Sequence, residues 1–190
     1  MWDKLKFWWH YEARWYLRDF RLGIRNLRRW FPVIWRDRDW DPHFIYEVLA
    51  YKLEQQASHI AQNDRHVSAA RDAEKMLTCV RLIRLQQEEL YRMEYMDYYT
   101  ETHEMIPTDE TKKWYTVEST PVEDRLAEYF AKYPRQHKRV LSGDINWFKK
   151  SSADDRSQLE IALEIGLENQ ERSRQLLFKI LNENIDSWWN

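Results

Sequence analysis

Hydrophobic and polar positions repeat with a helical period near the start of the chain. Between Leu5 and Phe31 there is one glycine and no proline, and Pro32 follows. This pattern predicts one long helix that ends at the proline. Its apolar side carries Trp2, Leu5, Trp9, Ala13, Tyr16, Phe20, Ile24, Leu27 and Phe31. A helix with one apolar stripe normally buries that stripe, so we expect these rings to lie in the core.

The other side of this helix is basic. Arg14, Arg18, Arg21, Arg25 and Arg28 recur at spacings of 4, 3, 4 and 3 residues, and Arg29 flanks them. One interpretation is the solvated face of a core helix. The other is an anion-binding surface, because guanidinium groups are permanently charged and match phosphate in shape.

Three further helical regions follow. Asp41-Pro42 is typical of a helix start, and a helix is expected from Pro42 to about Gln62. The next should run from about His66 to Tyr99, and the two most simply form an antiparallel hairpin. A last helix is predicted from near Ser152 to the terminal tryptophans.

The region between the hairpin and the last helix is less regular. Residues 100–119 lose the period and predict a surface excursion, with a short extended piece at 113–118. Thr120–Glu123 has the pattern of a capping box and predicts a helix to about Tyr133. Pro134 should kink or restart it, and Ser142-Gly143 should close it.

The predicted fold class is all-α: a long N-terminal amphipathic helix, an antiparallel helical hairpin and a C-terminal helix packed as an irregular bundle. Three glycines and five prolines in 190 residues fit this class better than a sandwich or a barrel. We expect one domain over residues 1–190. No apolar run reaches the ~18 residues that span a bilayer, so no membrane partner is expected. A membrane-surface role for the first helix is disfavoured, because the other helices need it as an apolar partner.

Charge is unevenly distributed. Residues 1–40 hold ten Lys or Arg against five Asp or Glu, or +5, and the remainder holds 20 against 27, or −7. The single cysteine, Cys79, excludes an internal disulfide and suits a reducing compartment. Its mid-helix position favours a buried structural thiol over a nucleophile.

Catalytic and metal signatures are weak. The six histidines form no ligand set, and three glycines leave no room for a phosphate-binding loop. We therefore predict no catalytic residues, no metal, no cofactor and no enzymatic activity. A hydrolase or transferase stays an alternative, since Asp37, Asp39, Glu47 and Glu74 could cluster in three dimensions.

The strongest candidate site is the segment from Trp35 to Asp41, where charged residues lie between large rings. It is either a salt-bridged helix junction or a pocket wall, in which rings stack on a base and arginines meet phosphates. The predicted ligand-binding residues are Arg25, Arg28, Arg29, Trp35, Arg36, Arg38 and Trp40, with Arg71 and Lys75 from a facing helix.

Several blocks resemble a widespread family of helical proteins from tailed bacteriophages. They are Gly23–Leu27, Trp30–Pro32, Trp35–Asp41, Lys52–Glu54, Ala70–Cys79, Leu177–Lys179 and the terminal Trp188-Trp189. The resemblance covers most of the chain except about 100–150, so 120–150 is treated as a variable insert. Asn190 departs from the acidic residue usual there. The resemblance implies a phage origin and action in the cytoplasm of the infected bacterial host, but it carries no activity.

These observations favour a non-enzymatic phage binding protein. By analogy with phage context, we expect it to sequester a small phosphorylated ligand of the cyclic-nucleotide or ADP-ribose type, such as a nucleotide immune signal, as an anti-defence sponge. The alternative is an adaptor for nucleic acid or a protein partner that uses the arginine ridge. Nucleic acid is less favoured because the remainder is acidic. The aromatic excess favours a homo-oligomer.

Overall fold

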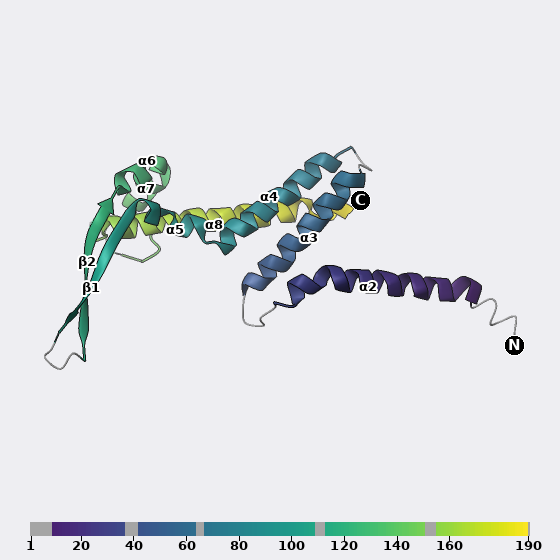
Figure 1. Cartoon of the computed structure of the whole chain (residues 1–190). Helices are drawn as coiled ribbons and strands as arrows, with labels where there is room; N and C mark the ends of the chain where they lie inside the picture. The colour runs from purple at the N-terminus through teal and green to yellow at the C-terminus, as the bar shows by residue number, and fades with distance from the viewer. Residues whose placement is uncertain (1–8, 37–41, 64–66, 109–112, 151–154, 190) are drawn as a thin grey trace. The chain divides into compact units, whose positions relative to one another are not determined.

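A computed structural model describes residues 9–36, 42–63, 67–108, 113–150 and 155–189 of the chain (Figure 1). The chain forms two compact units, residues 1–52 (unit 1) and residues 53–190 (unit 2). Each unit is described by itself.

Unit 1 consists of a π-helical turn, Trp9–Ala13, then α2, Arg14–Ile34, and the first half of α3, Pro42–Asn63. Pro32 lies inside α2, so this helix passes the residue that was expected to end it. Helix α2 contacts α3 near the C-terminal end of α2, where Val33 is buried. The Trp30 and Tyr51 rings pack edge-on there, with their centroids 5.1 Å apart.

The apolar side of α2 is not buried as the sequence pattern predicted. Phe20 is 66% exposed and Leu27 61% exposed, and Val33 is the buried residue of this helix. The physical reason is the size of the partner within the unit. Only the segment of α3 up to Lys52 is present in unit 1, and its contacts lie at the C-terminal end of α2.

In unit 2, the second half of α3 pairs with α4, Ala69–Gln87 (Figure 1). Leu53, Ala57 and Ile60 are buried on α3, and Arg84 of α4 lies 3.7 Å from the Glu54 carboxylate. The predicted helix to Tyr99 ends early, at Gln87. Glu89 adopts a left-handed φ of 48° there, and α5, Leu90–Met93, and a 3₁₀ turn, Glu94–Asp97, follow.

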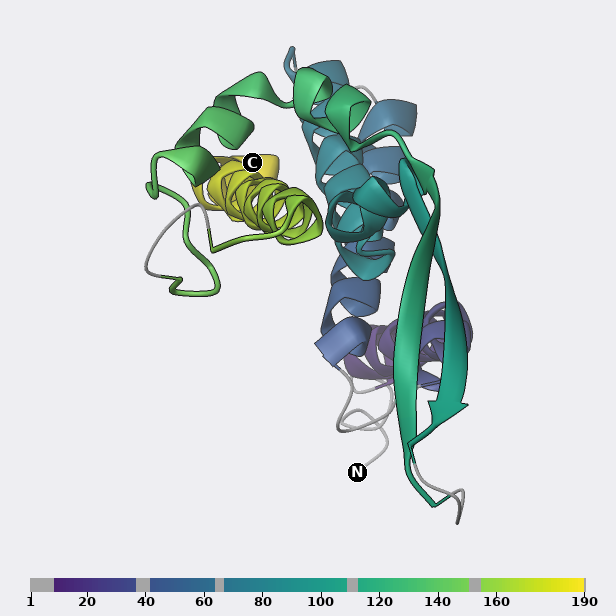
Figure 2. The same ribbon diagram turned by 90° about the vertical axis from the view of Figure 1, so that its left-hand side faces the viewer.

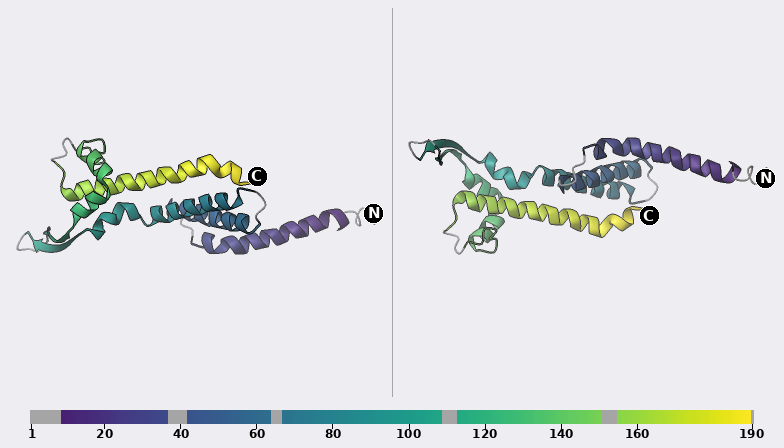
Figure 3. Two further views of the ribbon diagram at one scale, coloured as in Figure 1. Left: turned by 90° about the horizontal axis from the view of Figure 1, so that it is seen from above. Right: turned by 90° about the horizontal axis from the view of Figure 1, so that it is seen from below.

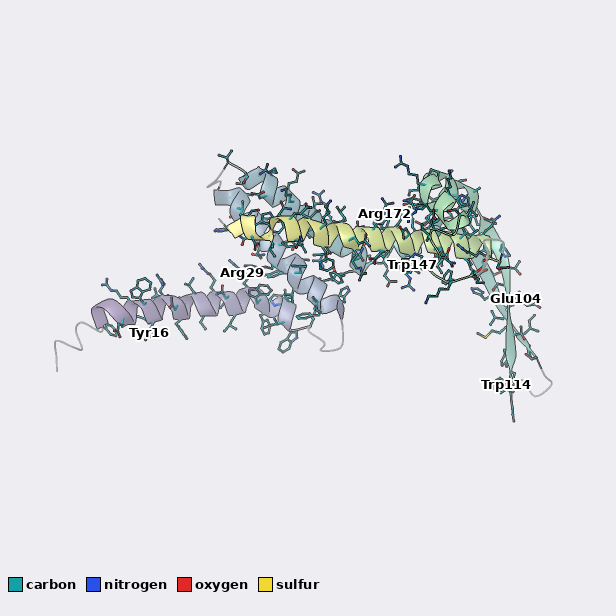
Figure 4. The ribbon with its side chains drawn as sticks, turned by 180° about the vertical axis from the view of Figure 1, so that it is seen from behind. Tyr16, Arg29, Glu104, Trp114, Trp147 and Arg172 are labelled. Atoms are coloured by element: carbon teal, nitrogen blue, oxygen red, sulfur yellow. The ribbon has the colours of Figure 1, made fainter. Side chains whose placement is uncertain are left out.

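The chain is predominantly α-helical but not all-α, because β1, Tyr99–Pro107, and β2, Tyr115–Asp124, form a two-stranded antiparallel ribbon (Figure 2). The helix predicted from Thr120 to about Tyr133 begins only at Leu126, since Thr120 pairs with Thr102 in the ribbon. Strand pairing takes up the backbone groups that a helix would use. Figure 4 shows Glu104 and Trp114 projecting from the ribbon.

Three more helices complete unit 2: α6, Leu126–Lys132, α7, Pro134–Leu141, and α8, Gln158–Asn184. As predicted, Pro134 opens a new helix, and Gly143 follows α7 with a φ of 81°. The last helix begins later than expected, because Ser157 and Glu160 form its capping box.

Helix α8 contacts α4, α5, α6 and α7 (Figures 2 and 3). Where α5 crosses it, a Cβ on Gly166 would lie 2.9 Å from the Tyr91 carbonyl oxygen, so only glycine permits this approach. One hydrophobic cluster against α8 contains Leu126, Tyr129, Val140, Ile145, Ile161, Ala162 and Ile165.

A buried ion pair fastens the segment after α7 to the start of α8. Arg156 Nη1 donates to Glu164 Oε2 at 2.5 Å, and also to the carbonyl oxygens of Val140 and Ile145. Glu164 Oε1 accepts from the Phe148 backbone N–H at 3.3 Å. Both charged side chains are almost fully buried, so each depends on the other for compensation of its charge.

We predict that Arg156→Met lowers the free energy of unfolding by about 3–5 kcal/mol, because it leaves the Glu164 carboxylate buried without its cation. Adding Glu164→Leu should restore much of the loss. The matched control is Arg139→Met, which breaks an exposed pair with Glu168 and should cost about 1 kcal/mol or less. Urea unfolding measures all four proteins, and equal losses for Arg156→Met and Arg139→Met would contradict the prediction.

Candidate functional site

The arginine face of α2 is the main cationic surface of unit 1. We use this name for Arg14, Arg21, Arg25, Arg28 and Arg29, all on α2 and all exposed. Within residues that the structure describes, none of these five guanidinium groups forms an ion pair with a carboxylate. The Asp19 carboxylate is 3.3 Å from Arg18 instead. The face is therefore available to an external anion.

The face extends along the helix. Arg28 follows Arg14 by fourteen positions in the sequence, which corresponds to about 21 Å at 1.5 Å per residue. Two hollows of about 470 Å³ and 460 Å³ lie along it. Both are formed by side chains of α2 alone, so they are shallow surface features. This arrangement can hold several anionic groups in a row, but it does not enclose a small molecule.

A third hollow, which we call the corner groove, lies at the corner between α2 and α3. It has a volume of about 450 Å³ and is lined by Pro32, Val33, Arg36, His43, Phe44, Glu47 and Tyr51. Arg36 supplies a guanidinium group and Phe44 and Tyr51 supply rings. Glu47 adds a carboxylate, which opposes the binding of an anion.

Tyr51 also contacts the turn of α2 that precedes Pro32. A proline has no N–H to donate, and its ring disturbs the hydrogen bonding of the preceding turn. The Tyr51 hydroxyl donates to the Arg29 carbonyl oxygen in that turn at 2.7 Å. This bond ties α3 to α2 one residue after Arg28, whose carbonyl would accept from residue 32 in a regular helix.

The predicted site residues of unit 1 are partly brought together. Arg25, Arg28 and Arg29 lie on α2, whose side chains Figure 4 shows standing out along the helix. Trp35 is the C-cap residue of α2 and its side chain is 74% exposed. The centroids of the Trp35 and Phe31 rings are 5.0 Å apart. Arg36 lines the corner groove.

Four predicted ligand-binding residues remain. Arg38 and Trp40 lie outside the described residues. Arg71 and Lys75 belong to α4 in unit 2 and make contacts there. Arg71 lies 3.9 Å from the Asp72 carboxylate, and the Lys75 ammonium donates to Asn184.

Sequence reasoning missed the α3 side of the corner groove. His43, Glu47 and Tyr51 are spaced by four residues and therefore share one face of α3, with Phe44 beside them. That spacing was visible in the sequence. The spacing shows that these residues share a face of α3, but it does not show that α2 lies against that face.

Reactive side chains also lie outside unit 1, in the described ranges. Cys79 is fully buried, as expected, and burial raises the pKa of its thiol to about 11, so the thiol stays protonated near neutral pH. No set of three or more metal-ligating side chains occurs among the described residues.

The closest approach to a catalytic constellation is on the β-ribbon. The Ser119 hydroxyl lies 2.8 Å from His103 Nδ1, and Glu101 lies 3.7 Å from His103 Nε2. His103 and Ser119 are opposite each other on paired strands, and both are exposed. A nucleophile needs a positioned oxyanion stabiliser and exclusion of water. An open strand face supplies no shelter from water, so we interpret this set as a cross-strand contact.

Comparisons of the chain with protein-family models, curated proteins and solved structures find no match. The resemblance to phage proteins therefore stays a prediction. None of the helices in the described ranges is both long enough and apolar enough to cross a membrane.

We predict that Tyr51→Phe lowers the free energy of unfolding by roughly 0.5–1.5 kcal/mol, because the Arg29 carbonyl loses its donor while the ring contact with Trp30 remains. The control is Tyr46→Phe, whose hydroxyl, also on α3, has no hydrogen-bond partner among the described residues. Denaturant unfolding followed by circular dichroism compares them. Equal stability of the two variants would show that the hydroxyl contributes nothing.

Proposed function

We propose that this chain is a non-enzymatic binding protein that holds an array of phosphate groups on the arginine face of α2. One observation carries the proposal: the five guanidinium groups of this face lack carboxylate partners among the described residues. Arginines that only solubilise a helix are commonly paired with acidic residues three or four positions away. Between Arg14 and Ile34 there is one acidic residue for six arginines.

The length of the face supports an extended ligand over a small one. A row of about 21 Å exceeds the reach of a single mononucleotide phosphate group. Guanidinium groups at helical spacing can each meet one phosphate of a polymer or of a surface. Asp19 is the one acidic residue between Arg14 and Ile34, and the acidic excess belongs to residues 41–190.

We predict that Arg14→Gln/Arg21→Gln/Arg25→Gln weakens binding to a labelled single-stranded oligonucleotide, used as a regular phosphate array. Three lost contacts should reduce the magnitude of the slope of log K against log salt by about 2, since each contact contributes ~0.7. Fluorescence anisotropy over a salt series measures the slope.

The control carries the same charge change in unit 2, as Arg81→Gln/Arg135→Gln/Arg172→Gln. These arginines are also exposed and have no carboxylate partner among the described residues. The control should keep the wild-type slope. If the salt slope falls equally in both triple variants, the effect depends only on net charge. That result would contradict specific phosphate binding by the arginine face.

The corner groove supports a second candidate, the sequestration of a small phosphorylated ligand. Its volume of about 450 Å³ lies in the range of small-molecule sites, and it combines rings with Arg36. In this second candidate function, the protein acts as an anti-defence sponge. It binds a cyclic nucleotide or an ADP-ribose derivative and does not change it chemically.

We predict for this candidate that Arg36→Gln weakens the binding of the best ligand in a nucleotide panel by roughly tenfold or more, as expected for one charge-assisted hydrogen bond. Isothermal titration measures the affinity, and heat-released ligand should be intact on a column. Arg172→Gln, which removes an exposed arginine of unit 2 without a carboxylate partner among the described residues, is the control. Absence of binding across the panel would exclude the sponge while leaving the phosphate array untouched.

The biological setting of the proposal rests on the resemblance to tailed-phage proteins. It places the protein in the cytoplasm of an infected bacterium. Self-association into a homo-oligomer belongs to the same proposal and is supported by the excess of Trp and Tyr.

A further inference from the structure

The side of α2 that adjoins the arginine face is apolar and uncovered within unit 1. We call Tyr16, Phe20, Ile24, Leu27 and Phe31 the α2 stripe. They recur at spacings of 4, 4, 3 and 4 residues, and every one of them is exposed, Tyr16 and Phe20 by 66% each. Leaving such a stripe in water is unfavourable, so its exposure indicates an external apolar phase or surface.

The stripe and the arginine face form one continuous surface. Phe20 and Ile24 line the same hollow as Arg21, Arg25 and Arg28. Arginine stems can lie along apolar surface while their guanidinium groups reach a polar layer. A ligand that satisfies both sets must therefore offer an apolar region directly beneath a layer of anionic groups.

Nucleic acid meets only half of this requirement, since its phosphates would contact the arginines while the stripe stayed in water. A second copy of α2 would cover the stripe. However, pairing would bring two strongly basic helices together, with Asp19 as the one acidic side chain between Arg14 and Ile34 of each. An anionic phospholipid surface offers acyl chains and phosphates at the required depths.

We propose that α2 lies in the plane of an anionic phospholipid surface, with the α2 stripe in the acyl boundary and the arginine face against the lipid phosphates. This inference rests on the proposed phosphate-binding function and names the source of the phosphates. This proposal replaces the expectation of no membrane partner, because no described helix covers the α2 stripe within unit 1. The helix lies on the bilayer and does not cross it, in keeping with the finding for the described helices. Trp35 at one end and Tyr16 at the other supply amphipathic rings that suit the headgroup level.

The test is co-sedimentation of the full chain with vesicles of phosphatidylcholine alone or mixed with phosphatidylglycerol. The wild type should bind the mixed vesicles and not the neutral ones. Phe20→Ser/Leu27→Ser should weaken binding to the mixed vesicles by about tenfold or more, because two large apolar side chains no longer enter the lipid. The same variant should keep its affinity for the oligonucleotide, which contacts only the arginines.

The matched control is Leu176→Ser/Phe178→Ser, which removes the same two side-chain types from exposed positions on α8. It should bind vesicles as the wild type does. Circular dichroism and thermal unfolding confirm that each variant is folded. A fall in thermal stability for Phe20→Ser/Leu27→Ser alone would mean that the stripe is packed inside the folded chain, and would overturn the proposal.

Two other outcomes would overturn it. One is oligonucleotide binding without vesicle binding, in which case the phosphate-binding function survives and the lipid does not. The other is self-association, measured by sedimentation equilibrium, that disappears in Phe20→Ser/Leu27→Ser while the wild type ignores vesicles. That result would assign the stripe to a second copy. If the wild type binds neither the oligonucleotide nor the vesicles, the proposed phosphate-binding function fails together with the lipid proposal.

Discussion

The buried contact between Arg156 and Glu164 is the interaction on which the organisation of unit 2 depends. Removing two charges from water costs several kcal/mol per ion, and the cost is offset only where geometry and further hydrogen bonds are good. Here the carbonyls of Val140 and Ile145 and the Phe148 N–H supply those bonds. The pair thereby fastens the end of α7 and its connector to α8. Helix α8 in turn provides the surface that α4, α5 and α6 share.

Unit 1 shows the opposite balance. In α2 the charged groups are at the surface, where they keep their hydration and pay no desolvation cost. The large rings are exposed as well. The contacts between the two helices of unit 1 lie at the corner groove. There the Trp30 ring packs edge-on against Tyr51, and the Tyr51 hydroxyl donates a hydrogen bond to the Arg29 carbonyl oxygen. A helix that contacts its partner only near one end leaves the rest of its surface uncovered within the unit. The arrangement therefore suits recognition by a face better than enclosure in a pocket.

Local signals in the sequence predicted elements well where one residue decided the backbone. Pro134 opens a helix because its fixed φ suits the first turn, and Gly143 follows α7 because it tolerates a positive φ. The same reasoning failed at Thr120–Glu123. A capping-box pattern there is also compatible with an extended strand, and pairing with β1 decided the outcome. Short polar segments carry no periodicity strong enough to separate the two.

The sequence by itself determined the amphipathic character of α2, its arginine row and the predominance of helix, because these follow from residue spacing along one element. Only the tertiary structure decided that the rings of α2 stay exposed, that Tyr51 and Arg36 share a groove, and that Glu164 on α8 is buried with Arg156. Periodicity shows which side of a helix is apolar. Whether another element covers that side, or a charge finds a buried partner, depends on contacts between segments that are distant in the chain.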